Sequence, residues 1–102
     1  MKKLYKNMGK QFACSLCYNG IMGGVLYLNS DELRYRTNKL VFDEKYRNLV
    51  MPIKNIREIT WKWFLFPIAT FSMSDGEEYT IMIYNKSRFV KAYQEVIGLN
   101  YK

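Results

Sequence analysis

The segment VLYLNSDELRYR, residues 25–36, has the clearest strand–turn–strand pattern in this chain. In its second half Leu33 and Tyr35 alternate with Arg34 and Arg36, and in its first half leucines alternate with other residues. Successive side chains of a strand point to opposite faces, so the leucines face a core if the arginines face solvent. The segment therefore predicts an antiparallel hairpin with one buried face.

A second hairpin is predicted at residues 69–83, ATFSMSDGEEYTIMI. Its central Asp75-Gly76 pair suits the positive φ angles of a tight turn. Elsewhere, turn-forming residues separate short runs rich in Val, Ile, Tyr, Phe and Thr, which is typical of an antiparallel β meander. On each side of the central turn, apolar residues recur at every second position: Ala69, Phe71 and Met73, then Ile81 and Ile83.

The period of the apolar residues changes once, in NKSRFVKAYQEVIG at residues 85–98. Here they recur at steps of three and four, which predicts an amphipathic helix over about residues 86–97. Asn85 is suited to cap the start of this helix, and Gly98 to follow its end. The predicted apolar face consists of Phe89, Ala92, Tyr93, Val96 and Ile97.

The length of 102 residues and the hydrophobic content of 49% fit a single globular domain over residues 1–102. With strands over about residues 10–84 and one helix near the end, the sequence predicts a mainly β fold with a C-terminal α-helix. Several short strands need to bury their inner faces. Closure into a barrel, with the helix packed against one open end, would achieve this.

The chain is basic, with 16 Lys and Arg against 9 Asp and Glu and a formal net charge of +7. Such a charge attracts anions, which include lipid headgroups, nucleic acids and acidic proteins. The uncharged residues 11–30 follow a basic start, but they contain too many Gly and Asn for a spanning helix, which needs about 20 predominantly apolar residues. We therefore expect a cytoplasmic protein, or one that is peripheral on the inner face of the membrane.

Four motifs, taken in order, resemble those of GRAM domains. GGVLYLNSDELRYR (residues 23–36) is similar to the family's GG-LYLT-xx-RL-F hairpin, and MPIKNI (51–56) is similar to its IPL-x-x-I segment. SDGEEYTIMI (74–83) is similar to the KDG-x-x-x-F hairpin, and SRFVKAYQEV (87–96) to the final helix. The resemblance covers residues 19–96, and in length the chain is similar to small stand-alone bacterial members.

The resemblance implies a PH-like barrel of two nearly orthogonal antiparallel sheets, with seven strands in all and the C-terminal helix as a cap. GRAM domains are intracellular modules that bind lipids or proteins, so the resemblance implies a binding module without catalytic residues. The chain departs from the family at Asn29, where Thr is common, and at Arg34, where a hydrophobic residue is common. It also departs at Trp61 and Trp63, where members tend to have polar or basic residues.

The sequence offers little for catalysis or metal binding. It has no histidine, which is the commonest general base and metal ligand. Its acidic residues are scattered, and the groups Asp31-Glu32, Asp43-Glu44 and Asp75 to Glu78 fall at predicted turns. Cys14 and Cys17 form a C-x-x-C pair, but in a strand they face opposite sides about 10 Å apart, beyond the roughly 7 Å reach of a disulfide. Zinc would need four ligands. We therefore expect two reduced strand cysteines, no enzyme activity and no cofactor.

Four basic residues are candidates for contacting an anionic ligand: Arg34, Arg36, Lys39 and Lys62. The first three run along a predicted strand and its loop, and Lys62 lies in the aromatic stretch WKWFLFP at residues 61–67. Four basic residues at an anionic leaflet contribute about 4 kcal/mol, which corresponds to only millimolar affinity. Membrane binding would therefore also need apolar insertion or multivalency. Alternatively, the charge simply keeps the domain in solution.

The aromatic stretch can be interpreted in two ways. Apolar and polar residues alternate from Ile59 to Trp63, which places Trp61 and Trp63 on the face of Ile59, in the core or at a barrel mouth. The resemblance instead places both tryptophans near a turn between two strands. The three apolar residues that follow cannot all face inward from one strand, so at least one should be exposed. They are Phe64, Leu65 and Phe66.

Together these features predict a non-enzymatic, GRAM-like module that binds anionic lipid headgroups or a membrane surface. The four basic residues would supply charge, and Phe64 with Leu65 would supply insertion. The alternative is a protein-interaction module or a homodimer, formed through the aromatic stretch or a sheet edge. In either case, contact with the membrane or partner would come from Trp61, Trp63, Phe64, Leu65 and Phe66. Nucleic acid is a less favoured partner, because the charge allows it but the resemblance does not suggest it.

Overall fold

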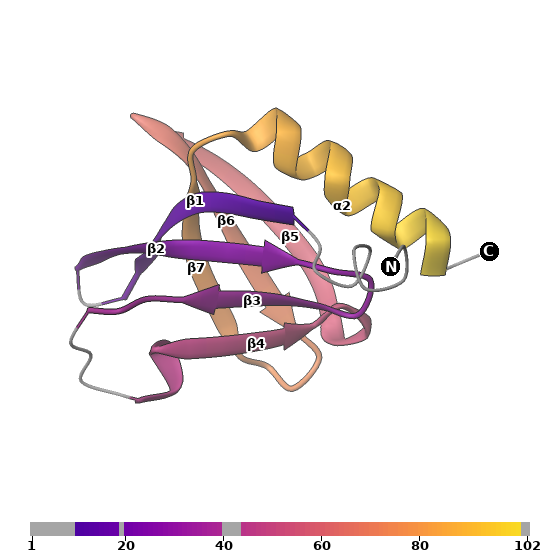
Figure 1. Ribbon diagram of the computed structural model, residues 1–102, viewed down its shortest axis with the longest axis horizontal. Helices are drawn as coiled ribbons and strands as arrows, with labels where there is room; N and C mark the ends of the chain where they lie inside the picture. Colours follow the sequence, from indigo (N-terminus) through magenta and orange to yellow (C-terminus); the bar gives the residue numbers. More distant parts are fainter. Residues whose placement is uncertain (1–9, 19, 40–43, 101–102) are drawn as a thin grey trace, which may run out of the picture.

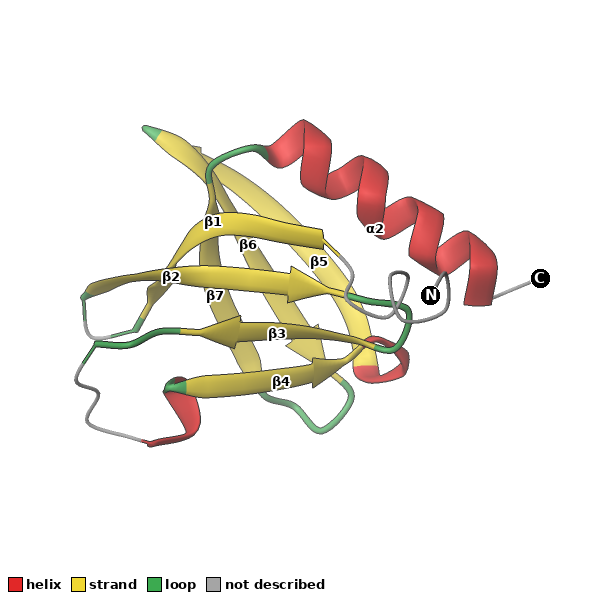
Figure 2. Cartoon of the chain, in the orientation of Figure 1, coloured by secondary structure: helices red, strands yellow, loops and turns green. Residues whose placement is uncertain are grey.

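The computed structural model describes residues 10–18, 20–39 and 44–100. This part of the chain forms one seven-stranded antiparallel sheet and a C-terminal α-helix (Figure 1; Figure 2). The predicted mainly β fold with one helix near the C-terminus is therefore confirmed. The strands are β1 (Lys10–Cys17), β2 (Ile21–Leu28), β3 (Glu32–Arg36), β4 (Asn48–Pro52), β5 (Ile56–Phe64), β6 (Phe66–Met73) and β7 (Glu78–Ile83). Two 3₁₀ turns, η1 (Glu44–Tyr46) and η2 (Ile53–Asn55), flank β4, and the helix is α2 (Lys86–Asn100).

The prediction of a closed barrel of two separate sheets is wrong. The strand order is β4-β3-β2-β1-β7-β6-β5, so one sheet runs from an edge at β4 to an edge at β5. In Figure 1, β5–β7 cross behind β1–β4, which places the core between two halves of a folded sheet. The halves join where β1 and β7 pair over only three positions, from Cys14–Ile83 to Leu16–Ile81. Between β4 and β5 the chain turns through η2, and α2 rather than a strand ladder covers the open side.

The β2–β3 hairpin forms as predicted. Leu28 pairs with Leu33, and Arg34 and Arg36 lie on the outer side of β3. The backbone N–H of Asp31 donates a hydrogen bond of 2.8 Å to the side-chain oxygen of Asn29, which is how asparagine stabilises turns. The inner side of the hairpin is buried, as its alternation indicates. It consists of Leu26, Leu28, Leu33 and Tyr35.

Gly24 on β2 lets the hairpin pack closely. A side chain at this position would collide with the carbonyl oxygen of Arg36 and with the ring of Tyr35. The Tyr35 hydroxyl donates a hydrogen bond of 2.7 Å to the Met22 carbonyl, which holds the ring across β2. Burial raises the pKa of Tyr35, because the ionised phenol would lose its hydration.

The β6–β7 hairpin also forms as predicted. Gly76 has a φ of 93°, and the backbone N–H of Glu77 donates a hydrogen bond of 2.9 Å to the Asp75 carboxylate. Glycine adopts this conformation without steric cost, so the Asp75-Gly76 pair ends β6 and starts the return. The inner face is buried and comprises Ala69, Phe71, Met73, Ile81 and Ile83.

Helix α2 begins where the sequence predicts. The backbone N–H of Arg88 donates a hydrogen bond of 3.2 Å to the Asn85 side chain, as expected for an N-cap. The predicted end at about residue 97, with Gly98 following it, is wrong, because the helix continues to Asn100. A single glycine within a helix costs only about 1 kcal/mol, so it does not have to end the helix.

Phe89 is the residue that inserts the helix into the core. It is 1% exposed, and its ring meets Phe12 and Phe71 edge-on and stacks on Tyr93. Because Phe12 belongs to β1 and Phe71 to β6, this one side chain contacts both halves of the folded sheet. The helix thus fills the side that the strands leave open.

Candidate functional site

The β5–β6 hairpin ends in four exposed apolar side chains, residues 63–66, which we call the hairpin tip. Trp63 is 72% exposed, Phe64 67%, Leu65 74% and Phe66 45%. In Figure 1 this end of the β5–β6 hairpin projects beyond the rest of the sheet. Contiguous apolar side chains on a projecting turn are typical of a contact surface for a membrane or a partner. The tip is therefore the leading candidate site.

Leu65 forms the apex of the tip. Phe64 and Phe66 pair across it, and its φ is 62°. This left-handed conformation is uncommon for a residue with a side chain, and it carries a local energetic cost. The prediction that at least one residue of 64–66 is exposed is confirmed, since all three are.

The base of the tip is anchored to the rest of the sheet. The ring of Phe66 meets Tyr84 edge-on, with 4.9 Å between ring centroids. The Tyr84 hydroxyl shares a hydrogen bond of 2.6 Å with the buried hydroxyl of Ser15 on β1. Pro67, which pairs with Trp63, is buried. The tip therefore projects from an ordered base.

The two tryptophans have different environments. Trp61 is partly buried and packs against the core, with its ring 6.1 Å from that of Phe89 and the ammonium of Lys86 4.8 Å from its ring centroid. Alternation correctly places Trp61 on the inner face beside Ile59. The same alternation predicts Trp63 in the core or at a barrel mouth, and this is wrong. Beyond Trp61 the strand extends past the helix, so Trp63 has no apolar layer to pack against.

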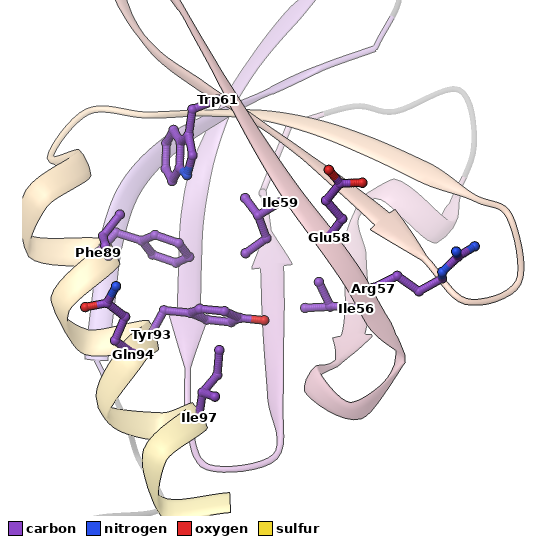
Figure 3. A pocket seen from close by; sticks show the side chains of 10 residues that line it. Ile56, Arg57, Glu58, Ile59, Trp61, Phe89, Tyr93, Gln94 and Ile97 are labelled. Atoms are coloured by element: carbon purple, nitrogen blue, oxygen red, sulfur yellow. The ribbon is translucent and has the colours of Figure 1, made fainter. Parts of the chain in front are cut away.

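A groove of about 410 Å³ lies between β5 and α2 (Figure 3). Trp61, Ile59 and Ile56 line it from the strand, and Tyr93 and Ile97 line it from the helix. Figure 3 shows Arg57 and Glu58 at its rim, pointing away from the helix. The sequence places Ile59 and Trp61 on the inner face of the strand, and Tyr93 and Ile97 on the apolar face of the helix, but nothing in it predicts the incomplete burial that leaves a groove between them. The lining is mixed, with Arg57, Glu58 and Gln94 beside the apolar side chains, and the groove borders the free edge of β5.

The four predicted basic residues do not form one site. Arg34 and Arg36 lie on the outer side of β3, and Lys39 follows that strand. Four strands separate β3 from β5 in the sheet, so Lys62 lies on the other half of the molecule. Arg34 also forms an ion pair of 2.8 Å with Glu32. The structure therefore brings only Lys62 to the hairpin tip.

Neither cysteine has the environment of a reactive thiol. Both are free and lie in β1, as predicted, with Cys14 buried and Cys17 partly buried. Burial raises the pKa of Cys14 to about 12, and burial likewise raises that of Cys17. Thiolates are the reactive form, so these shifts oppose nucleophilic chemistry. Within the described ranges, no three His, Cys, Asp or Glu side chains are placed to hold a metal ion.

Comparisons with known proteins give a fold but no family. No family model matches the chain, and no curated protein does. Among solved structures, it is similar to the C-terminal domain of an unknown protein from Leishmania infantum, with a TM-score of 0.73 and 8% sequence identity over 93% of this chain and 87% of that one. At this identity the similarity extends to the fold alone. No helix in the described part of the chain is long and apolar enough to cross a membrane.

Proposed function

We propose that the chain is a GRAM-like, PH-like and non-enzymatic module that docks on anionic membrane surfaces by inserting its hairpin tip. The observation that carries this proposal is the run of four exposed apolar side chains at residues 63–66. Seven antiparallel strands followed by a terminal helix support the PH-like part, because the GRAM resemblance implies that number and order of elements, although it implies a closed barrel and the sheet is open.

Insertion of the tip supplies the affinity that charge alone lacks. Full burial of a large apolar side chain contributes about 1.5–3 kcal/mol, so Trp63, Phe64 and Leu65 together would contribute about 5 kcal/mol or more. Aromatic rings also favour the headgroup depth of a bilayer. Lys62 next to the tip would add about 1 kcal/mol against an anionic leaflet.

The other predicted basic residues have a smaller role in this proposal. Arg34, Arg36 and Lys39 lie on the opposite half of the sheet from Lys62. They raise the overall positive potential, which accelerates approach to an anionic surface. The proposal assigns them no headgroup contact while the tip is inserted. We therefore expect salt to weaken binding less than it would if all four residues touched lipid.

Vesicle co-sedimentation tests the proposal. The probe is phosphatidylcholine vesicles with and without phosphatidylserine, and the variant is Leu65→Ser. We expect binding that increases with phosphatidylserine, and a loss of about tenfold or more in Leu65→Ser, because one large apolar side chain no longer inserts.

Ile21→Ser is the matched control. The side chain of Ile21 is 69% exposed, a fraction similar to the 74% of Leu65. Ile21 lies at the start of β2, away from the hairpin tip. It should bind vesicles as the wild type does. Equal losses in both variants, or no binding by the wild type at any phosphatidylserine content, would overturn the proposal.

A further inference from the structure

The two edges of the sheet differ in how well they are protected from pairing with another strand. β4 has five residues, ends at Pro52 and lies between the 3₁₀ turns η1 and η2. β5 has nine residues and no proline. Among the described residues, none pairs with β5 on the side away from β6. Long unpaired edges readily accept another strand, and natural sheets usually blunt them.

Residues 58–62 of β5 carry charges of opposite sign at equal distances from Thr60, with one apolar residue on each side of it. Glu58 and Lys62 are both exposed on the outer face, two positions before and two positions after it. Neither forms an ion pair in the described part of the chain. Ile59 and Trp61, one position away on either side, face inward and are partly buried. The one irregularity in the pairing of β5 lies before Glu58, so this segment is regular strand.

We propose that β5 pairs in antiparallel fashion with β5 of a second copy of this chain, with the two-fold axis at Thr60. Glu58 then lies opposite Lys62 of the second copy, and by symmetry Lys62 lies opposite the second copy's Glu58. Opposite charges directly across a strand pair stabilise it. On the inner face Ile59 lies opposite Trp61, again twice. The interface is isologous and therefore closes as a dimer.

The charges select this register over its neighbours. The smallest shift that keeps each residue on its own face is two positions. Such a shift places Glu58 opposite Thr60 or opposite Phe64, and both ion pairs are lost. If the charges served only to repel other strands, two charges of the same sign would do so in any register. Opposite signs at equal distances from Thr60 instead favour self-pairing in one register.

Self-pairing also affects the ends of the strand. Beyond Lys62, the strand continues through Trp63 and Phe64, and these positions run alongside the start of the second copy's β5. Part of the hairpin tip is therefore covered in the dimer. The proposal does not depend on membrane binding, because the dimer is measured in the absence of lipid.

Charge exchange tests the register. Sedimentation velocity over a concentration series would give the dimer dissociation constant for the wild type, for Glu58→Lys, for Lys62→Glu and for the double variant. Each single change places like charges opposite each other at two points and should weaken the dimer about tenfold or more. The double variant restores both pairs with reversed polarity and should regain wild-type affinity. Circular dichroism would verify that all four proteins fold.

Cross-linking tests the position of the axis. Thr60→Cys places two thiols at the dyad, where mild oxidation should join position 60 to position 60 of the second copy. Thr70→Cys is the matched control. Thr70 lies on β6 and pairs with Thr60, but β6 has a neighbouring strand on both sides, so Thr70 is not at a free edge. It should give no such cross-link, and peptide mass spectrometry would identify the joined positions. The native thiols are common to both variants.

Three outcomes would overturn the proposal. The first is a wild type that stays monomeric at every concentration. The second is a dimer that the double charge exchange fails to restore. The third is an equal yield of cross-links from Thr60→Cys and Thr70→Cys, which would indicate random encounter. A peptide from another protein that binds β5 while the chain remains monomeric would also count against it.

Discussion

Trp61 and Trp63 lie two residues apart on the same strand, and alternation gives them the same face, yet their environments differ. Trp61 packs beside Phe89 beneath the ammonium of Lys86, whereas Trp63 is among the most exposed apolar side chains in the described part of the protein. The strand is continuous through both residues. The difference comes from the helix, which packs over Trp61 but does not reach Trp63.

This contrast shows what a periodic pattern can and cannot specify. Alternation determines which side of the sheet a residue faces. It does not determine whether another layer covers that side, which depends on where α2 starts and how far β5 extends. The covered part of β5 therefore contributes to stability, while the part beyond Trp61 is left exposed.

Removing the ring of Phe89, which inserts α2 into the core, should have the largest effect on stability. Phe89→Ala deletes a buried ring that contacts both halves of the sheet, and such changes typically cost about 3–5 kcal/mol. We expect a loss of that size in the free energy of unfolding, measured by urea denaturation. Val90→Ala, a smaller change on a partly buried neighbour, is the control. A loss below about 1 kcal/mol for Phe89→Ala would mean that Phe89 does not hold the helix against the open side of the sheet.

Substitution of the two tryptophans tests the comparison directly, and the expected changes in the free energy of unfolding are smaller. Trp61→Ala should lower the free energy of unfolding by about 2 kcal/mol, because a partly buried ring leaves the core. Trp63→Ala should change it by less than about 0.5 kcal/mol, as for most exposed positions. Urea denaturation of the two variants measures both values. Equal effects would show that the two environments do not differ as described.

The two cysteines extend the comparison to β1, with an effect that is absent at neutral pH and appears only above pH 9. The pKa of Cys14 is raised from 9.0 to about 12 in the folded protein, so above pH 9 the unfolded chain binds fewer protons than the folded one. The free energy of unfolding should therefore fall as pH rises from 9 towards 12. Cys14→Ala should reduce this slope, whereas Cys17→Ala should reduce it less, because Cys17 is only partly buried. Urea denaturation at several alkaline pH values measures the slopes, and identical slopes in wild type and Cys14→Ala would contradict the prediction.

The elements of the fold were largely predictable from the sequence, because local signals specify them. The alternation at Leu33 and Tyr35, the Asp75-Gly76 turn and the Asn85 cap each place an element within a few residues of where it lies. The open sheet was not predictable in this way, since it depends on β4 and β5 failing to meet, which no local pattern encodes.

The candidate site was predictable only in part. An apolar run at residues 64–66 implies exposure from strand geometry alone. The separation of Lys62 from Arg34 depends on strand order, which short motifs do not specify. The groove beside β5 exists because α2 packs incompletely against that strand. The apolar residues of α2 have the spacing of an ordinary core-facing helix, so the sequence does not indicate the gap. These features are tertiary, and each arises from the relative placement of elements distant in sequence.

The left-handed backbone at Leu65 has a thermodynamic implication. Glycine would adopt this conformation with less strain, so a glycine at the apex would make the folded domain more stable. It would also remove the most exposed large hydrophobic side chain among the described residues. Under the proposed membrane insertion, a glycine at the apex would therefore gain stability at the cost of binding, a trade-off known from functional surfaces that are suboptimal for folding.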